Sequence, residues 1–407
     1  MVLSQPSPSV VGVITHLTVH GYRSIQDLVV PLGPLTVVTG ANGTGKSNLH
    51  RAMRLLAGIA HGRLIASLAR EGGLSQVLWA GPEHFTSAMR RGEVAIEGTA
   101  SRRDPVSLML GVATDDLGYL VDVGLPRVDP ATTAFFRDPE IKREAVFAPP
   151  VLRPAATLVD RRWRRVRVRR GAGWHEIGEP VSPRHSVIED LADLEHPPEL
   201  VALRRMMAGW RFHDGLRTDP SSPARRSCVA TRTPVLADDG HDLAAAVATV
   251  QESAWGSTFE AAVADALDGS RVSTVAGADA SLALQVHHRG LLRPLGAAEI
   301  SDGTLRFIML ACALLAPELP GVLVLNEPET SLHPDVLPAL ADLVAEAVAR
   351  TQVVLVCHDR GLVEHLRSRV GDGLVHHELC RDHGRTVLAG ADLLNAAPWQ
   401  WGRRRRW

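Results

Sequence analysis

The sequence has few cysteines, and their spacing limits the chemistry that they can support. Cys228, Cys312, Cys357 and Cys380 form no CxxC pair and lack the close Cys/His spacing of a zinc site. This pattern argues against a cysteine-based metal centre. It favours a reducing compartment, so we expect a cytoplasmic protein.

Long apolar runs and a secretory leader are also missing. The N-terminus lacks the basic region, apolar core and cleavage site of a signal peptide. Residues 307–325 are the most apolar stretch, but Pro317, Glu318 and Pro320 interrupt it short of about 18 clean residues. We therefore expect a buried helix followed by a buried strand, and no membrane partner.

Lysine is almost absent, since Lys46 and Lys142 are the only two in 407 residues and arginine supplies the other basic side chains. The formal charge of -1 gives no indication of a polyanionic partner. Apolar residues make up 45% and charged residues 22%, which is ordinary for a folded globular chain. Because the chain uses arginine almost everywhere else, a lysine inside a glycine-rich loop is hard to explain as a chance residue.

Short apolar strands alternate with helical segments at both ends of the chain. The predicted strands are residues 13–20, 35–39, 322–325 and 353–357, and the predicted helices are residues 47–58, 304–315 and 336–349. Continuous apolar strands that alternate with helices indicate a parallel sheet covered on both faces. The predicted class is therefore α/β.

The middle of the chain differs in composition from its two ends. Residues 101–284 are rich in Pro, Arg and Gly, and we interpret them as a large α+β insertion that forms a lid. The predicted head domain, residues 12–395, is then discontinuous, with its core in residues 12–100 and 285–395. Residues 396–407 form a basic tail that we expect to be disordered.

A complete GxxxxGK[ST] loop lies between a predicted strand and a predicted helix. It consists of Gly40, Ala41, Asn42, Gly43, Thr44, Gly45, Lys46 and Ser47. The glycines let backbone N–H groups turn around phosphate oxygens, and the helix that follows adds its dipole. Lys46 would contact the β- and γ-phosphates of ATP, and the Ser47 hydroxyl would bind Mg²⁺.

The second motif follows the apolar strand 322–325 and consists of Asn326, Glu327, Pro328 and Glu329. In an open α/β sheet, ligands bind at the carboxyl ends of the strands. Glu327 could there accept a proton from the water that attacks the γ-phosphate, with Glu329 as the next candidate. A solvated loop is the alternative for a lone Glu, but the phosphate loop elsewhere in the chain favours the catalytic role.

Two further features are structural when taken alone. Ser301, Asp302 and Gly303 precede an apolar helix, and Ser301 is suited to cap it. His358 directly follows the strand 353–357.

In this order the motifs resemble the ABC-type P-loop ATPase heads of the RecF, structural-maintenance-of-chromosomes (SMC) and OLD-like group, over residues 12–100 and 285–370. The SDGT and SLHP sequences at residues 301–304 and 331–334 carry the resemblance to its compact predicted ATPases. The segment 19–25 also resembles the N-terminal strand and arginine of that group, which implies that Arg23 reaches the phosphates. The resemblance implies a mainly parallel sheet with an N-terminal antiparallel portion.

The resemblance also implies a homodimer in which two heads meet head to tail and hold two ATP molecules between them. Ser301 and Gly303 would face the γ-phosphate held by Lys46 of the other copy. His358 would contact the γ-phosphate or the attacking water. The predicted catalytic residues are therefore Glu327, His358 and Lys46.

Two positions depart from the pattern of that group. The residue before the catalytic Glu is usually Asp, and here it is Asn326, which keeps a carbonyl acceptor for the Mg²⁺ shell and loses the charge. A metal-contacting glutamine is expected near the end of the first core segment, where Gln76 is the nearby candidate. Because Asn326 lacks the carboxylate charge, we expect weaker metal affinity, although Ser47 remains.

A basic run occupies residues 160–170, with seven arginines around Trp163. It could neutralise DNA phosphates while Trp163 stacks on a base. The alternative is a hairpin strand with Val166 and Val168 turned inward and arginines facing solvent, and the near-zero net charge favours it.

The leading functional hypothesis is an ATPase whose ATP-driven dimerisation acts on DNA or on a DNA-processing partner, in repair or in defence against phage. A second hypothesis, favoured by Asn326, is a slowly hydrolysing scaffold that controls a separate effector protein. A transporter subunit is a third hypothesis, and the large insertion and the SDGT and SLHP sequences argue against it.

Overall fold

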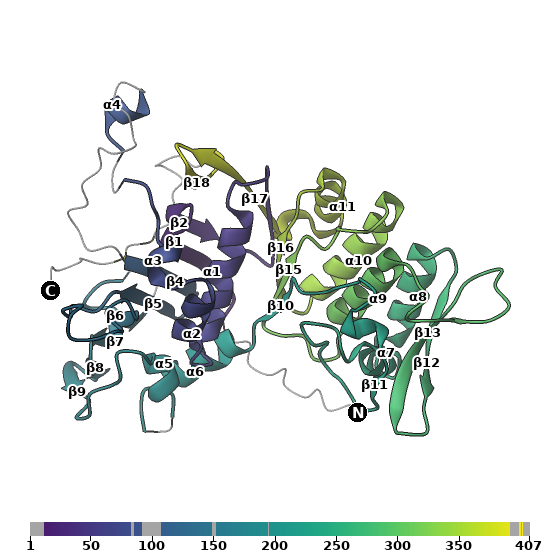
Figure 1. The fold of residues 1–407 in the computed structure, drawn as a ribbon, viewed down its shortest axis with the longest axis horizontal. Coiled ribbons are helices and arrows are strands. Elements are labelled where there is room, and N and C mark those ends of the chain that lie inside the picture. The colour runs from purple at the N-terminus through teal and green to yellow at the C-terminus, as the bar shows by residue number, and fades with distance from the viewer. Residues whose placement is uncertain are drawn as a thin grey trace. The chain divides into compact units, whose positions relative to one another are not determined.

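The computed structural model describes residues 12–82, 85–91, 107–148, 152–193, 195–390, 399 and 401 (Figure 1). The chain divides into two compact units. The first consists of Met1–Gly33, Thr39–Gly209 and His377–Trp407, and the second of Pro34–Val38 and Trp210–His376. Most of the predicted tail, 396–407, lies outside the described residues.

The first unit is built on an eight-stranded sheet in which every neighbouring pair is antiparallel. In spatial order its strands are β2 (Ile25–Pro31), β1 (Ile14–Tyr22), β4 (Ser107–Thr114), β5 (Gly118–Gly124), β6 (Glu140–Phe147), β7 (Thr157–Arg162), β8 (Arg165–Arg170) and β9 (Gly173–Glu176). Every residue of β4 and β5 is buried, so both faces of the sheet are covered at its centre.

Among the described residues of the first unit there are six helices. They are α1 (Lys46–Ile59), α2 (Leu64–Arg70), α3 (Leu74–Val77), α4 (Ser87–Arg90), α5 (Val187–Asp190) and α6 (Pro198–Ala208). α1 packs on β1 and β4 through a stripe that includes Leu49, Met53 and Leu56. The antiparallel pair β17 (Leu374–Asp382) and β18 (Arg385–Leu388) also contributes, with β18 lying against β2.

A parallel sheet forms the centre of the second unit. Its order is β10 (Arg211–His213), β15 (Val322–Asn326), β16 (Gln352–Val356) and β3 (Leu35–Gly40). A smaller antiparallel sheet contains β11 (Cys228–Val229), β13 (Ser281–His287), β12 (Arg271–Ala276) and β14 (Leu295–Gly296). β15 and β16 are buried almost throughout, as expected for parallel strands covered on both faces.

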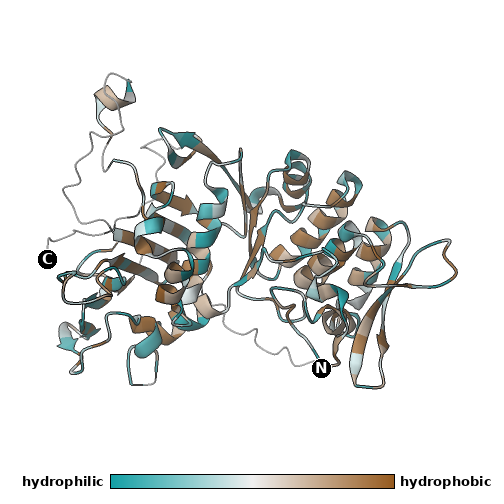
Figure 2. Cartoon of the chain, viewed as in Figure 1, coloured by the Kyte–Doolittle hydropathy of each residue, from teal (hydrophilic) through white to brown (hydrophobic). Residues whose placement is uncertain are grey.

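The helices of the second unit share one apolar core with these strands. They are α7 (Leu243–Gln251), α8 (Gly256–Ala266), α9 (Asp302–Leu314), α10 (Leu337–Val348) and α11 (Arg360–Val370), with three short 3₁₀ turns at Pro223–Arg225, Pro334–Val336 and Gly371–Gly373. Figure 2 shows apolar and polar residues mixed along most helices of both units. This mixture is typical of helices that bury one face.

The predicted α/β class is confirmed, with a parallel sheet and an N-terminal antiparallel portion. The antiparallel portion is larger than expected, because β4 pairs with β1 and the strands up to β9 extend the same sheet. The segment predicted as an inserted lid, residues 101–284, contributes residues to both units. No helix among the described residues is long and apolar enough to cross a membrane.

Two tryptophans near the C-terminus are described and contact the first sheet. Trp399 packs edge-on against Phe147 at 5.7 Å, and the Trp401 indole donates a hydrogen bond to Asp27 at 3.0 Å. Both tryptophans of the predicted tail therefore have partners on this sheet, and the disorder expected for the tail stays a prediction. The four cysteines are free thiols.

Candidate functional site

The predicted phosphate loop connects the end of β3 to the start of α1 at Lys46. Gly40, Gly43 and Gly45 all have positive φ, at 148°, 81° and 109°. At Gly45 a Cβ atom would lie 2.1 Å from the Thr386 side chain. The loop therefore needs glycine at this position for both its backbone conformation and its packing.

Three side chains outside the loop support it: Thr386 of β18, Ser24 in the turn between β1 and β2, and Asn48 of α1. Thr386 on β18 donates a hydrogen bond to the Thr44 carbonyl at 2.8 Å, and its hydroxyl lies 2.7 Å from that of Ser24. Asn48 on α1 donates to the same Ser24 hydroxyl at 2.8 Å. Ser24 and Thr386, which are far from the loop in the sequence, thus stabilise its conformation.

Lys46 is turned back onto the loop that it would use to hold a nucleotide. Its amine donates to the carbonyls of Gly40 at 2.5 Å and Ala41 at 3.3 Å, and the residue is only 6% exposed. α1 has no side-chain cap and no acidic residue in its first turn, so its N–H groups can receive an anion. Ser47 is exposed beside them. These features fit the phosphates of ATP.

Arg23 and Gln76 lie on neighbouring segments of the first unit. The Arg23 backbone N–H donates to the Val77 carbonyl at 2.6 Å, one residue beyond the exposed Gln76. The Arg23 guanidinium pairs with Glu71 at 2.6 Å, and the Tyr22 hydroxyl donates to the same carboxylate at 2.7 Å. Burial and Glu71 together raise the pKa of Tyr22. The phosphate role of Arg23 and the metal role of Gln76 stay predictions.

The strand ends of the parallel sheet lie in register. Asn326 at the end of β15 is paired with Val356 of β16, which is in turn paired with Val38 of β3. The Glu327 N–H donates to the Val356 carbonyl at 2.7 Å. Val38 of β3 therefore lies level with Asn326 across the sheet, and the phosphate loop begins two residues later in the sequence.

Glu327 adopts a left-handed backbone conformation with φ of 48°, which is uncommon for a residue with a side chain. Arg306 of α9 stabilises this turn, because its guanidinium donates to the Glu327 carbonyl at 2.8 Å and the Pro328 carbonyl at 3.3 Å. Burial lowers the pKa of Arg306, and the nearby Glu329 and Glu327 oppose this effect.

Glu329 and His358 form a close pair. One carboxylate oxygen of Glu329 accepts the His358 backbone N–H at 2.8 Å and lies 3.0 Å from the ring nitrogen Nδ1. The Glu329 side chain is 5% exposed and that of His358 is 55% exposed. Glu329 is therefore an internal group, whereas the His358 ring extends from the strand edge toward solvent.

Ser301 caps α9 as predicted, since its hydroxyl accepts the Thr304 N–H at 3.1 Å. A Cβ atom at Gly303 would lie 2.7 Å from the Ser331 carbonyl, so the start of α9 touches the segment 331–334. Ser301, Ser331 and His333 are all exposed. Two motifs separated by about thirty residues thus share one surface of the second unit.

The sequence did not predict the roles of Arg225 and Arg306. Arg225 contacts the segment before α9, and Arg306 contacts the turn at Glu327. Arg225 pairs with Asp302 at 2.7 Å and donates to the carbonyls of Ala297 and Ile300. Arg306 carries the only charge of α9 after its first turn. A lone arginine in an otherwise apolar helix was the signal that could have identified it, whereas Arg225 left no such pattern.

The basic run forms the β7–β8 hairpin, so the favoured interpretation is confirmed for most of it. Val166 and Val168 are buried, and Trp163 at the turn is 51% exposed. Arg161 departs from the expectation, because it is fully buried and pairs with Glu144 at 2.6 Å. This buried pair is tolerated because backbone carbonyls accept from Arg161, and two hydroxyls and the Val187 N–H donate to Glu144.

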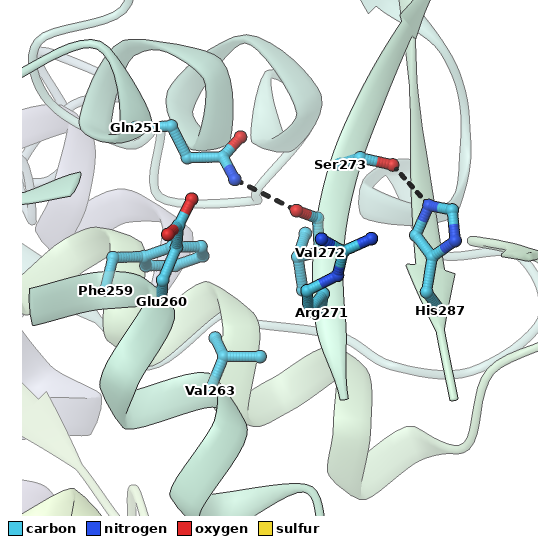
Figure 3. Close-up of a pocket in the computed structure, with 8 residues that line it drawn as sticks. All are labelled: Gln251, Phe259, Glu260, Val263, Arg271, Val272, Ser273 and His287. Atoms are coloured by element: carbon cyan, nitrogen blue, oxygen red, sulfur yellow. Dashed lines mark hydrogen bonds between the residues drawn. The ribbon is translucent and has the colours of Figure 1, made fainter. Parts of the chain in front are cut away.

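The second unit also contains a cavity of about 280 Å³ between α7, α8 and the β12–β13 pair (Figure 3). It is lined by Gln251, Phe259, Glu260, Val263, Arg271, Val272, Ser273 and His287. Gln251 donates to the Val272 carbonyl at 2.9 Å, and Ser273 lies 2.9 Å from the His287 ring nitrogen. None of the predicted site residues lines it.

A family model described as "AAA domain, putative AbiEii toxin, Type IV TA system" matches residues 35–364. The chain belongs to this family. The match begins at β3 and ends in α11, so it includes the phosphate loop, the SDGT segment, Glu327 and His358. This AAA-family chain is therefore a P-loop ATPase, and its family implies that it binds a nucleotide.

Comparisons with individual proteins give shorter or more distant similarities. This AAA-family chain is 42% identical to an OLD nuclease of Thermus scotoductus over 45 residues, which are 11% of this chain and 8% of that protein. It resembles the SMC head domain from Thermotoga maritima with a TM-score of 0.46 at 12% identity, covering 93% of this chain and 99% of that one. The Smc head domain from Pyrococcus yayanosii gives 0.48 at 10% identity, covering 94% and 98%.

Proposed function

We propose that this ATPase works as a head-to-tail homodimer, in which ATP joins the phosphate loop of one copy to the Ser301 end of α9 in the other. The contact between Gly303 and the Ser331 carbonyl is the observation that carries the proposal. It unites the start of α9 and the segment 331–334 into one exposed surface. A dimer seam needs such a continuous surface.

The charge balance at the start of α9 also suits an anionic partner. The first-turn N–H groups of this 13-residue helix carry partial positive charge and have no partners within the helix. Ser301 satisfies only that of Thr304. Asp302 would repel a phosphate, but Arg225 neutralises it at 2.7 Å. The helix end can therefore attract the γ-phosphate.

In this proposal Lys46 and the loop N–H groups hold the β- and γ-phosphates, and the Glu327 carboxylate accepts a proton from the attacking water. His358 contacts the γ-phosphate or that water. Arg23 reaches the phosphates only after leaving Glu71.

Mg²⁺, when bound, supplies positive charge to the phosphate oxygens. The Ser47 hydroxyl would bind it directly, with Asn326 and Gln76 contributing carbonyl oxygens through water. Few protein ligands are consistent with Mg²⁺, because it keeps several waters and uses substrate phosphates. We place this chemistry in the cytoplasm, where the four free thiols stay reduced.

A slowly hydrolysing scaffold that controls a separate effector protein is the second candidate. Asn326 favours it, because an amide at this position holds the Mg²⁺ shell without the charge of a carboxylate. Turnover measured at saturating ATP separates the two: a rate well below the usual range of about 1 to 1000 per second supports the scaffold.

The dimer is tested with Ser301→Arg. We expect this substitution to leave ATP binding by the single subunit nearly intact and to block ATP-dependent association, since the arginine would clash with the opposite copy. Light scattering with ATP and Mg²⁺, compared with the nucleotide-free state, measures the change in mass. Ser301→Ala is the matched control: it loses the same cap, worth about 1 kcal/mol, without added bulk.

A mixture of Lys46→Ala and Ser301→Arg subunits provides the decisive variant of this test. Each mixed dimer would retain one composite site in which both residues are intact and would carry one clashing arginine where the Ser301→Arg homodimer has two, so part of the ATPase activity should reappear on mixing. If wild-type protein gains no mass with ATP and the mixture stays inactive, the composite-site proposal is wrong.

We also propose DNA as a partner, through the outward arginines of the β7–β8 hairpin. Asp160 already pairs with Arg167 at 2.6 Å and Arg162 at 3.2 Å, which reduces the charge available on that face. Arg164 and Arg165 are exposed beside Trp163. These side chains are the ones that could contact a phosphate backbone.

If this surface binds DNA, affinity should fall steeply with salt, and Gln at Arg164, Arg165 and Arg167 should flatten that dependence by roughly one unit of slope per lost phosphate contact. Filter binding over a salt series, with and without ATP, measures it. Gln at the exposed Arg204 and Arg205 of α6 provides a control. Absence of DNA binding at low salt would indicate a protein partner instead.

A further inference from the structure

The pair formed by Glu329 and His358 goes beyond what the motifs indicate. Glu329 follows Glu327 by two residues, and its side chain turns inward at the sheet edge, where it is 5% exposed. One oxygen, Oε1, accepts the backbone N–H of His358 at 2.8 Å and lies 3.0 Å from its ring nitrogen Nδ1. The carboxylate therefore holds the backbone and the ring of a single residue.

The position of Oε1 beside the ring favours one location for the imidazole proton. Oε1 lies 3.0 Å from Nδ1, and because an ionised carboxylate can only accept, it favours a proton on Nδ1 over one on Nε2 alone. The other nitrogen, Nε2, makes no hydrogen bond within the described part of the chain. It lies on a side chain that is 55% exposed.

A packing role alone does not explain Glu329. Its second oxygen, Oε2, is buried and has no hydrogen-bond partner among the described residues. Burying an unsatisfied polar atom costs about 1 to 3 kcal/mol, which an apolar side chain of similar size would avoid. The cost is consistent with a carboxylate that is retained for its effect on His358.

The segment 327–329 also connects His358 to α9. Arg306 holds the Glu327 and Pro328 carbonyls from one side, and Glu329 holds His358 from the other. The segment 327–329, held by Arg306 on one side and bonded to His358 on the other, therefore fixes the positions of the Glu327 turn and of His358. A shift in either would displace the other.

We propose that Glu329 is a positioning residue that keeps His358 protonated on Nδ1 and presents Nε2 to the nucleotide. This inference rests on the proposed role of His358 in ATP hydrolysis. Glu329 contacts neither ATP nor water in this scheme, and it acts only through the imidazole.

Substitutions at residue 329 test the idea through kcat. Glu329→Met removes the acceptor at similar volume, and we expect kcat to fall about 10- to 100-fold while ATP affinity changes less than about 2-fold. Glu329→Gln can still offer an amide oxygen at the position of Oε1, so it should recover most of the loss. Glu364→Met, on the exposed face of α11, serves as a control for added methionine.

The decisive measurement is a double-mutant cycle with His358→Ala. If Glu329 acts through the ring, Glu329→Met should lower kcat no further once His358 is alanine. Additive losses, or full activity of Glu329→Met alone, would overturn the inference. If Glu329→Met does not fold, as judged by thermal unfolding, the same cycle is run with Glu329→Leu and with Glu329→Gln.

Failure of the proposed function gives a different result. If His358→Ala itself leaves kcat unchanged while ATP still binds, the role of His358 in hydrolysis is wrong, and the inference about Glu329 falls with it. If His358→Ala lowers kcat but Glu329→Met does not, only the inference is overturned.

Discussion

Lys46→Ala abolishes ATP binding or weakens it by at least about 100-fold. The amine is the single lysine of the loop, and two charge-assisted hydrogen bonds to phosphate oxygens are worth about 3 kcal/mol or more. In the free protein it bonds the Gly40 and Ala41 carbonyls. A phosphate would offer the same amine anionic oxygens in their place. Isothermal titration with ATP and Mg²⁺ measures the loss.

Lys142→Ala is the matched control for this result, because Lys142 is the only other lysine in the chain. It lies in β6 and pairs with Glu140 at 2.7 Å, apart from the phosphate loop in sequence. Its loss should leave ATP affinity unchanged. Unchanged affinity in a folded Lys46→Ala protein would contradict the assignment of the loop.

The second large effect is expected for Glu327→Gln, which should keep ATP binding and lose about 100- to 10,000-fold in turnover. The amide occupies nearly the same volume but cannot accept a proton from water. The backbone at Glu327 has φ of 48°, and the substitution changes only the side chain, so the turn itself should persist. Steady-state release of phosphate measures turnover.

The same substitution should also trap the dimer, because ATP held across the seam would no longer be hydrolysed. Light scattering with ATP should then show a stable increase in mass for Glu327→Gln and a transient or smaller increase for the wild type. Glu364→Gln on α11 is a suitable control. Wild-type hydrolysis by Glu327→Gln would move the catalytic role elsewhere, with Glu329 as the next candidate.

Parts of the site that consist of consecutive residues could be predicted well. The loop of residues 40–47 needs glycine at set positions for any chain that wraps phosphate, so its pattern is visible without a structure. The cap formed by Ser301 follows from the local chemistry of a helix start. The apolar strands before Glu327 and His358 identified themselves by continuous hydrophobicity.

Contacts between segments that are far apart in the sequence could not be predicted from it as well. Arg161 and Arg167 stand in the same basic run, yet one is fully buried against Glu144 and the other pairs with Asp160 near the surface. Alternation along the strand separates the two valines from their neighbours, but it does not reveal an acidic partner on another strand. The ion pair between Arg23 and Glu71 could not be predicted for the same reason, because Glu71 lies outside the motif that contains Arg23.

The amino-acid sequence alone determined the family, the phosphate-binding loop and the order of strands and helices around it, because each depends on neighbouring residues. The tertiary structure decided which strands joined the first sheet, since antiparallel pairing of β4 with β1 links residues about ninety positions apart. It also decided that Glu329 holds His358 and that Arg306 holds the turn at Glu327. Hydrogen bonds of this kind depend on the relative positions of separate helices and strands in the folded protein, and packing of the apolar core sets those positions.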